Sequence, residues 1–214
     1  MIKITYDTKK YSFRDVVTNW LETNDLSKLH YIKKYEHFER ENDQSTIWHE
    51  KFYEMIRLDK SFDDIYIKFL EEIVKPRYNE TIVYQKIPTF RVHLPGNVSV
   101  GEFHKDKHYR NVEWAEKVKE TNYYLPLTKA YGTNTIWAET EENLGDFKPF
   151  DSNYGECIEW NASNLTHGNK DNITNATRVS FDFRVIPKSR YVDSNHLTIN
   201  TKIPFGIGGY YDII

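Results

Sequence analysis

The sequence predicts a mainly β protein, an antiparallel sandwich or jelly roll, preceded by a layer of α-helices. From about residue 81, short segments rich in β-branched and aromatic residues are separated by turn residues, with no βαβ alternation. Residues 1–79 instead carry apolar residues at helical spacing. Aromatic residues make up 15% of the chain, which suits a sheet-rich core filled by large side chains.

Three amphipathic stretches predict helices, at 12–22, 45–58 and 61–76. Ser12 is an N-cap candidate for the first, and Pro76 ends the third. Each needs an apolar partner surface, so we expect one helical layer packed on a sheet and no independent helical module.

Short segments rich in β-branched and aromatic residues predict six strand regions in the later part of the chain. They lie at 81–94, 99–106, 121–128, 134–140, 155–161 and 178–186. We therefore expect one structural domain in three parts: a helical layer at 1–79, a β core at 80–190 and an irregular tail at 191–214. The Gly-rich tail could cover the core or exchange between the subunits of a homodimer.

Composition narrows the class of protein. The formal net charge is −3 and no basic block occurs, so nothing predicts nucleic-acid binding. There is no apolar leader and no run of membrane-spanning length, and Cys157 is the single cysteine. We expect a cytoplasmic protein without membrane contact, in which the five Asn-x-Ser/Thr sequons are loop chemistry.

The segment GEFHKDKHYR carries His104, Asp106 and His108 two residues apart, which on a strand would place all three on one face. His167 opens a later strand, and strands distant in sequence face each other across a jelly roll. His104, Asp106 and His167 could thus converge on one ion. Two imidazoles and one carboxylate on one face of an octahedron suit non-haem Fe(II) in oxygenases. His108 is the rival ligand.

Arg178 lies eleven residues after His167, and Ser180 follows two residues later. The two share a strand face by the period-two rule. A buried guanidinium pairs with a carboxylate bidentately and keeps its charge when desolvated, so this strand predicts a site for a carboxylate ligand.

Together, His104-x-Asp106, His167 and Arg178-x-Ser180 resemble the motifs of Fe(II)/2-oxoglutarate-dependent oxygenases. The resemblance spans about residues 80–187 and is closest from Gly155 to Arg184, which includes the pair His167-Gly168. The helical front and the tail lie outside it.

The resemblance implies a double-stranded β-helix, that is, a cupin-like jelly roll. It implies that His104, Asp106 and His167 ligate Fe(II), and that Arg178, assisted by Ser180, binds the distal carboxylate of 2-oxoglutarate. With O2, such an enzyme would release succinate and CO2 and hydroxylate a small polar molecule. The intact carboxylate of Asp106 favours hydroxylation over halogenation.

Further candidates line the same predicted core. In relatives, a polar or Tyr side chain from a strand like 121–128 touches the co-substrate, which points to Asn122 or Tyr124. Gln85 and Arg91 share a face of the strand 81–94, and His108 is expected at the pocket mouth. These three are candidate substrate contacts.

Other residues are assigned structural roles or none. Trp160 is expected in the core, and His93, just before a turn, is expected to be a structural histidine. Four histidines outside the predicted barrel receive no role: His30, His37, His49 and His196.

Three alternatives remain open. The protein could be a metal-free jelly-roll epimerase or isomerase of sugar nucleotides, with His and Asp as an acid–base pair. It could hydroxylate a protein side chain, which would require an extended groove. It could also be a non-catalytic sandwich that binds carbohydrate or is stabilised by metal, although structural metal sites are usually closed by a fourth ligand.

Overall fold

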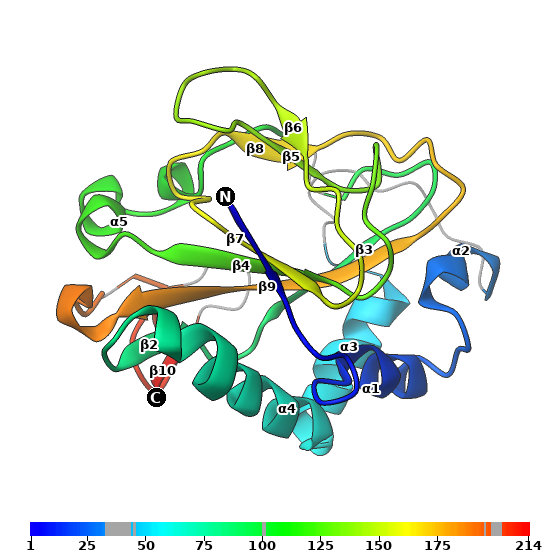
Figure 1. Ribbon diagram of the computed structural model, residues 1–214, viewed down its shortest axis with the longest axis horizontal. Helices are drawn as coiled ribbons and strands as arrows, with labels where there is room; N and C mark the ends of the chain where they lie inside the picture. Colours follow the sequence, from blue (N-terminus) through cyan, green and yellow to red (C-terminus); the bar gives the residue numbers. More distant parts are fainter. Residues whose placement is uncertain (33–43, 45, 100–101, 195, 198–202) are drawn as a thin grey trace.

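Two antiparallel β-sheets face each other, and a layer of helices covers the outer face of the larger sheet (Figure 1). The computed structural model describes residues 1–32, 44, 46–99, 102–194, 196–197 and 203–214. A sheet-rich protein with antiparallel sheets and N-terminal helices is what the sequence predicts, and this part of the prediction is confirmed.

The larger sheet has seven strands, six of which follow one order: β1 (Ile2–Thr5), β7 (Glu156–Trp160), β4 (Thr121–Pro126), β9 (Arg178–Pro187), β2 (Ile82–Gln85) and β10 (Tyr211–Ile213). Strand β3 (Thr89–His93) pairs with β9 beyond the end of β2. The smaller sheet has the order β6 (Lys148–Pro149), β5 (Ile136–Ala138), β8 (His167–Asn169). Strand β9 is central because it pairs with β2, β3 and β4.

Alternation along β9 separates the two sides of the large sheet. Its apolar side chains contribute to the core beneath the helices: Val179, Phe181, Phe183 and Val185. Three of its polar side chains line the space between the sheets: Arg178, Asp182 and Arg184. One strand thus supports the hydrophobic core on one face and a polar cavity on the other.

The helical layer consists mainly of α1 (Phe13–Trp20), α3 (Ile47–Leu58) and α4 (Ser61–Phe69). The short α2 (Leu29–Ile32) follows α1, and α5 (Val112–Val118) lies between β3 and β4 in the chain. Aromatic rings join this layer to the sheet: Phe13 and Phe62 approach Phe181 with ring centroids 5.0 and 5.3 Å apart. Such edge-to-face pairs add to the free energy of burying the rings. In the described part of the chain, no helix is long and apolar enough to span a membrane.

Helix ends differ in detail from the sequence prediction. Ser12 stands at the N-cap of α1, but its side chain makes no capping hydrogen bond. Thr46 caps α3 by accepting a hydrogen bond from the His49 amide. The third helix is regular only to Phe69 and continues as a π-turn and then a 3-10 turn that contains Pro76, because proline lacks the amide donor that an α-helix requires.

The ends of the chain contribute strands that the sequence prediction missed. Residues 1–79 were expected to be helical, yet β1 is an edge strand paired with β7. The tail 191–214 was expected to be irregular, yet β10 pairs with β2, with Tyr211 opposite Gln85. Both strands are too short to show a clear period. Both lie outside the expected core boundaries of 80–190.

The expected single strand at 81–94 is two strands. Tyr84 pairs with Val185, whereas Thr89 pairs with Asp182, so the registers of β2 and β3 on β9 differ by two residues. The break includes Pro88, which has no amide to donate to a sheet ladder.

The lowered pKa of buried His49 predicts how the stability of the fold depends on pH. Burial, aided by the charges of Arg91 and Arg178, lowers the pKa of His49 to about 3. An unfolded His titrates near pH 6.5, so below that pH the unfolded state binds the proton and the folded state does not. Stability should fall as the pH drops from 6.5 towards 3, by up to about 1.4 kcal/mol per pH unit. The free energy of unfolding can be measured by urea titration at several pH values between 7 and 5. It should decrease less steeply with falling pH in His49→Gln than in the parent, and an equal decrease would contradict the prediction.

Candidate functional site

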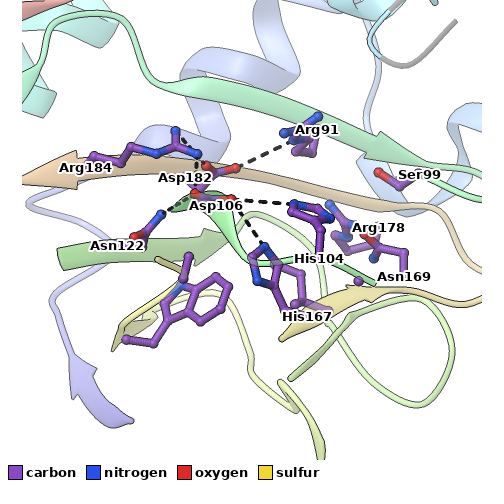
Figure 2. Close-up of a pocket in the computed structure, with 14 residues that line it drawn as sticks. Arg91, Ser99, His104, Asp106, Asn122, His167, Asn169, Arg178, Asp182 and Arg184 are labelled. Atoms are coloured by element: carbon purple, nitrogen blue, oxygen red, sulfur yellow. Dashed lines mark hydrogen bonds and ion pairs between the residues drawn. The ribbon is translucent and has the colours of Figure 1, made fainter. Parts of the chain in front are cut away.

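A cavity between the two sheets holds the metal-competent residues (Figure 2). Strand β9 supplies one wall, β8 supplies His167 and Asn169, and β4 supplies Asn122. Its free space, including the open mouth, is about 510 Å³. The remaining space between the sheets is filled by apolar side chains such as Phe150 and Trp160.

His104, Asp106 and His167 converge as the sequence analysis expects. The Nε2 atoms of His104 and His167 each lie 3.5 Å from Oδ1 of Asp106. One ligand atom from each of the three residues can be chosen so that all lie within 4.8 Å of one another. Within the described residues, no other group of His, Cys, Asp and Glu side chains has this geometry.

Both imidazoles are oriented for metal binding. Nδ1 of His104 lies 2.8 Å from the Glu102 carbonyl, and Nδ1 of His167 lies 2.9 Å from the Leu165 carbonyl. A proton on Nδ1 is thereby held by a backbone acceptor, which leaves the Nε2 lone pair directed at the common centre. Burial lowers the pKa of His167 to about 4, so its ring is neutral at neutral pH. The donor set therefore fits a divalent metal with open positions.

The chain brings these residues together in a way that differs from the expected strand. Instead of a regular strand at 99–106, the described part holds one isolated bridge, in which the amides of His104 and His167 donate to each other's carbonyl oxygens. Asp106 already belongs to a 3-10 helix, Asp106–Tyr109, and its amide donates to the Ala162 carbonyl. The period-two argument places His104, Asp106 and His108 on one face of a strand, whereas the structure has a bridge at His104 followed by a 3-10 helix that contains Asp106 and His108.

Gly168 permits this close approach. A Cβ placed there would lie 3.1 Å from the Glu102 carbonyl oxygen and 3.1 Å from Cα of Phe103. A side chain at this position would push the segment that carries His104 away from β8.

The second oxygen of Asp106 is held by positive and polar groups. Oδ2 accepts a hydrogen bond from Nη2 of Arg184 at 2.8 Å and lies 3.5 Å from Nδ2 of Asn122 (Figure 2). Burial raises the pKa of the Asp106 carboxyl, but the charge of Arg184, with help from His104, holds it well below its usual range. Asp106 is consequently an ionised ligand with one oxygen directed towards the histidines.

Arg178 is almost fully buried on the same cavity wall. Its Nε donates to the Asn134 carbonyl at 3.0 Å and its Nη1 donates to Oγ of Ser180 at 2.8 Å. On the neighbouring strand β4, the buried hydroxyl of Tyr124 lies close to the side chains of Thr135 and Ser180. The structure thus places a buried guanidinium on the cavity wall, with the hydroxyl of Ser180 bonded to it and the hydroxyl of Tyr124 close to Ser180.

Several cavity residues were not identified as site residues from the sequence, among them Ser99, Asn169, Asp182, Arg184 and Trp160. Asp182 and Arg184 continue the face of β9 that starts at Arg178, so the period-two rule could have found them. Trp160 was expected in the core; it is buried but also lines the cavity. Its ring packs edge-to-face against the His167 ring, with 4.7 Å between the ring centroids.

Of the three expected substrate contacts, Arg91 lines the cavity, whereas Gln85 and His108 do not. Arg91 lines the cavity, with its Nε 3.7 Å from Oδ1 of Asp182. Gln85 is buried behind the cavity wall and its Oε1 accepts from Arg184 at 3.2 Å, so it supports the site from behind. His108 was expected at the end of a strand near the pocket mouth. It lies instead on the 3-10 helix, exposed, and is not among the cavity residues.

The other histidines that the structure describes lie outside the cavity. His93 is buried, with its ring nitrogens near the carbonyls of Asn97 and Asn134, as a structural histidine would be. His30, His49 and His196 do not line the cavity. His37 lies outside the described residues.

Comparisons with known proteins place the chain in a family. No family model matches it. It is 33% identical to the streptomycin biosynthesis protein StrG of Streptomyces griseus over 212 aligned residues. The alignment covers 99% of this chain and 98% of StrG. The chain belongs to the StrG family.

Solved structures show that this StrG-family chain shares its fold with an oxygenase. The non-heme monooxygenase ThoJ, solved as a nickel complex, aligns with a TM-score of 0.50 and 12% identity over 87% of this chain and 73% of ThoJ. HygX from Streptomyces hygroscopicus, solved with nickel and 2-oxoglutarate, aligns over 93% of this chain and 88% of HygX, at 9% identity. The TM-score of this alignment is 0.41.

The geometry of the triad predicts that His167→Ala abolishes tight metal binding. Loss of a ligand nitrogen should exceed the effect of about 10–100-fold that is typical of changes to supporting residues. Anaerobic calorimetric titration with Ni(II) should show at least this loss of affinity, while His30→Ala should bind as the parent does. Parent-like affinity in His167→Ala would contradict the geometry.

Proposed function

We propose that the protein is an Fe(II)- and 2-oxoglutarate-dependent oxygenase with a double-stranded β-helix core, and that it hydroxylates a small polar molecule. The observation that carries this proposal is the position of buried Arg178, hydrogen-bonded to Ser180, on the wall of the cavity in which the side chains of His104, Asp106 and His167 converge. A two-His, one-carboxylate triad leaves the open positions that a bidentate co-substrate and O2 require.

Each residue has a role in this proposal. Nε2 of His104, Nε2 of His167 and Oδ1 of Asp106 would hold the iron. The guanidinium of Arg178 would pair with the distal carboxylate of 2-oxoglutarate, with Ser180 as a second donor. When bound, iron with 2-oxoglutarate and O2 supplies an oxidant that can remove hydrogen from an unactivated C–H bond, with release of succinate and CO2.

Tyr124 and Asn122 have different proposed roles. The buried hydroxyl of Tyr124 lies close to Ser180, which bonds to Arg178, and we assign it as a further donor to a co-substrate carboxylate held by Arg178. Asn122 already contacts Asp106, so we assign it to support of the metal ligand and not to the co-substrate.

The substrate would enter beside Arg91 and Asp182. Both side chains line the cavity, with Nε of Arg91 3.7 Å from Oδ1 of Asp182, and a guanidinium and a carboxylate at this wall suit a substrate that carries polar groups. The StrG relationship supports a small biosynthetic intermediate as substrate over a protein side chain. The metal-free epimerase alternative is less well supported, because both imidazoles direct Nε2 at one common centre.

The direct test is slow turnover of 2-oxoglutarate in the absence of another substrate. Anaerobically purified protein is loaded with Fe(II), mixed with 2-oxoglutarate, O2 and ascorbate, which returns the iron to Fe(II) when no substrate is oxidised, and assayed for succinate. The parent should form succinate, and Asp106→Ala should not. Metal-loaded parent that forms no succinate with or without candidate substrates would contradict the proposal.

The proposed role of Arg178 predicts that its substitution weakens the binding of 2-oxoglutarate. Arg178→Lys keeps the charge but loses the planar fork, and one lost charge-assisted hydrogen bond of about 1.5–3 kcal/mol corresponds to about 10–150-fold weaker binding. Titration of the Ni(II)-loaded protein with 2-oxoglutarate under anaerobic conditions measures this loss. Arg91→Lys is the matched control, since Arg91 lines the same cavity beside Asp182, and it should change the affinity little.

A further inference from the structure

The two oxygens of Asp106 have different partners. Oδ1 lies 3.5 Å from Nε2 of both histidines, whereas Oδ2 receives Nη2 of Arg184 at 2.8 Å (Figure 2). The carboxylate is therefore asymmetric before any metal is considered. One oxygen is directed to the ion site and the other is engaged by protein.

Arg184 is itself fixed from behind. Its Nη1 donates to Oε1 of Gln85 at 3.2 Å and to the hydroxyl of Tyr210 at 3.0 Å. The Gln85 amide cannot easily flip, because its Nε2 donates to the Ile87 carbonyl at 2.7 Å and to Thr89 Oγ1 at 3.0 Å. The guanidinium is thus held in one plane, with Nη2 directed at Asp106.

Tyr210 belongs to the C-terminal segment. Its carbonyl accepts from the Lys86 amide at 2.9 Å, and the next residue begins β10, which completes the edge of the large sheet. Tyr210 thereby connects the end of the chain to Arg184, and Arg184 connects it to a metal ligand.

We propose that Arg184 is a positioning residue that keeps Asp106 a one-oxygen ligand, and that Tyr210 extends this control to the C-terminal segment. The proposal rests on the metal site of the proposed function. A carboxylate without Arg184 could rotate and either bind the ion through both oxygens or turn away from it. The first would occupy a position needed by co-substrate or O2, and the second would weaken binding.

The two carboxylates near Arg184 support its role as a positioning residue. Arg184 lies 3.8 Å from Asp182 as well as 2.8 Å from Asp106, so its removal would leave two carboxylates close together in a buried site. Buried charges without partners are strongly destabilising, so Arg184 variants need a folding control.

The test compares metal binding and metal spectra, not only activity. Anaerobic titrations with Co(II) measure affinity, and the visible d–d absorption of bound Co(II) reports coordination number and geometry. Relative to the parent, Arg184→Gln should bind Co(II) about 10–100-fold more weakly, as is typical for loss of a supporting residue, and should change the absorption. Tyr210→Phe should shift both in the same direction by a smaller amount.

Two variants serve as matched controls. Arg91→Gln removes the other cavity arginine that contacts Asp182, and Tyr191→Phe removes a tail hydroxyl that faces Asp193 and the Ile207 amide. Both should keep the parent's Co(II) affinity and spectrum. Circular dichroism and thermal unfolding check that each variant is folded.

The outcomes distinguish the inference from the proposed function. Folded Arg184→Gln with parent affinity and spectrum overturns the positioning role. If Arg184→Gln does not fold, Tyr210→Phe decides, because it keeps both Arg184 and Asp106: an altered spectrum supports the role and an unchanged one overturns it. A parent that binds no divalent metal overturns the proposed function, and this inference with it.

Discussion

The two-residue period of β9 is the constraint on which the rest of the structure depends. Its odd-numbered residues from Val179 to Val185 must remain apolar to pack against the helices, and its even-numbered residues Arg178, Asp182 and Arg184 line the cavity. A shift of register by one residue would bury arginine beneath the helices and place phenylalanine in the site. Core and site are therefore specified by the same hydrogen-bonded ladders with β2, β3 and β4.

Placing charge inside a protein requires partners, and the cavity provides them. Three arginines (Arg91, Arg178 and Arg184) face two carboxylates (Asp106 and Asp182), with His167 neutral at ordinary pH. A divalent cation and a dicarboxylate carry opposite charges of equal size. The two together would leave the charge balance of the cavity as it is, whereas either alone would change it by two. This balance favours a site that binds metal and co-substrate together.

Sequence patterns predicted part of the cavity lining, because strand periodicity spaces several of its residues. His167, Arg178 and Ser180 lie on β8 and β9 as expected, and extension of the same rule would have added Asp182 and Arg184. His104 and Asp106 were identified through motif chemistry, although the local structure is a bridge followed by a 3-10 helix. That geometry depends on tertiary contacts with β8 and Ala162, which no local pattern encodes.

The parts that sequence analysis missed are short or non-local. Strands β1 and β10 have four and three residues, and pairing with β7 and β2, not periodicity, makes them strands. The link from Tyr210 to Asp106 joins residues more than one hundred positions apart through Arg184. Such contacts follow only from the assembled fold.

The central claim is that one cavity binds a metal and a 2-oxo acid side by side. The most direct measurement adds Fe(II) and then 2-oxoglutarate to the metal-free protein without oxygen and records the visible absorption of the chelated 2-oxo acid. The account predicts a weak band that appears only when both are present, and that is reduced in Arg178→Ala and absent in Asp106→Ala. No band in a parent that retains Fe(II) would contradict the claim that the cavity binds this co-substrate at the metal.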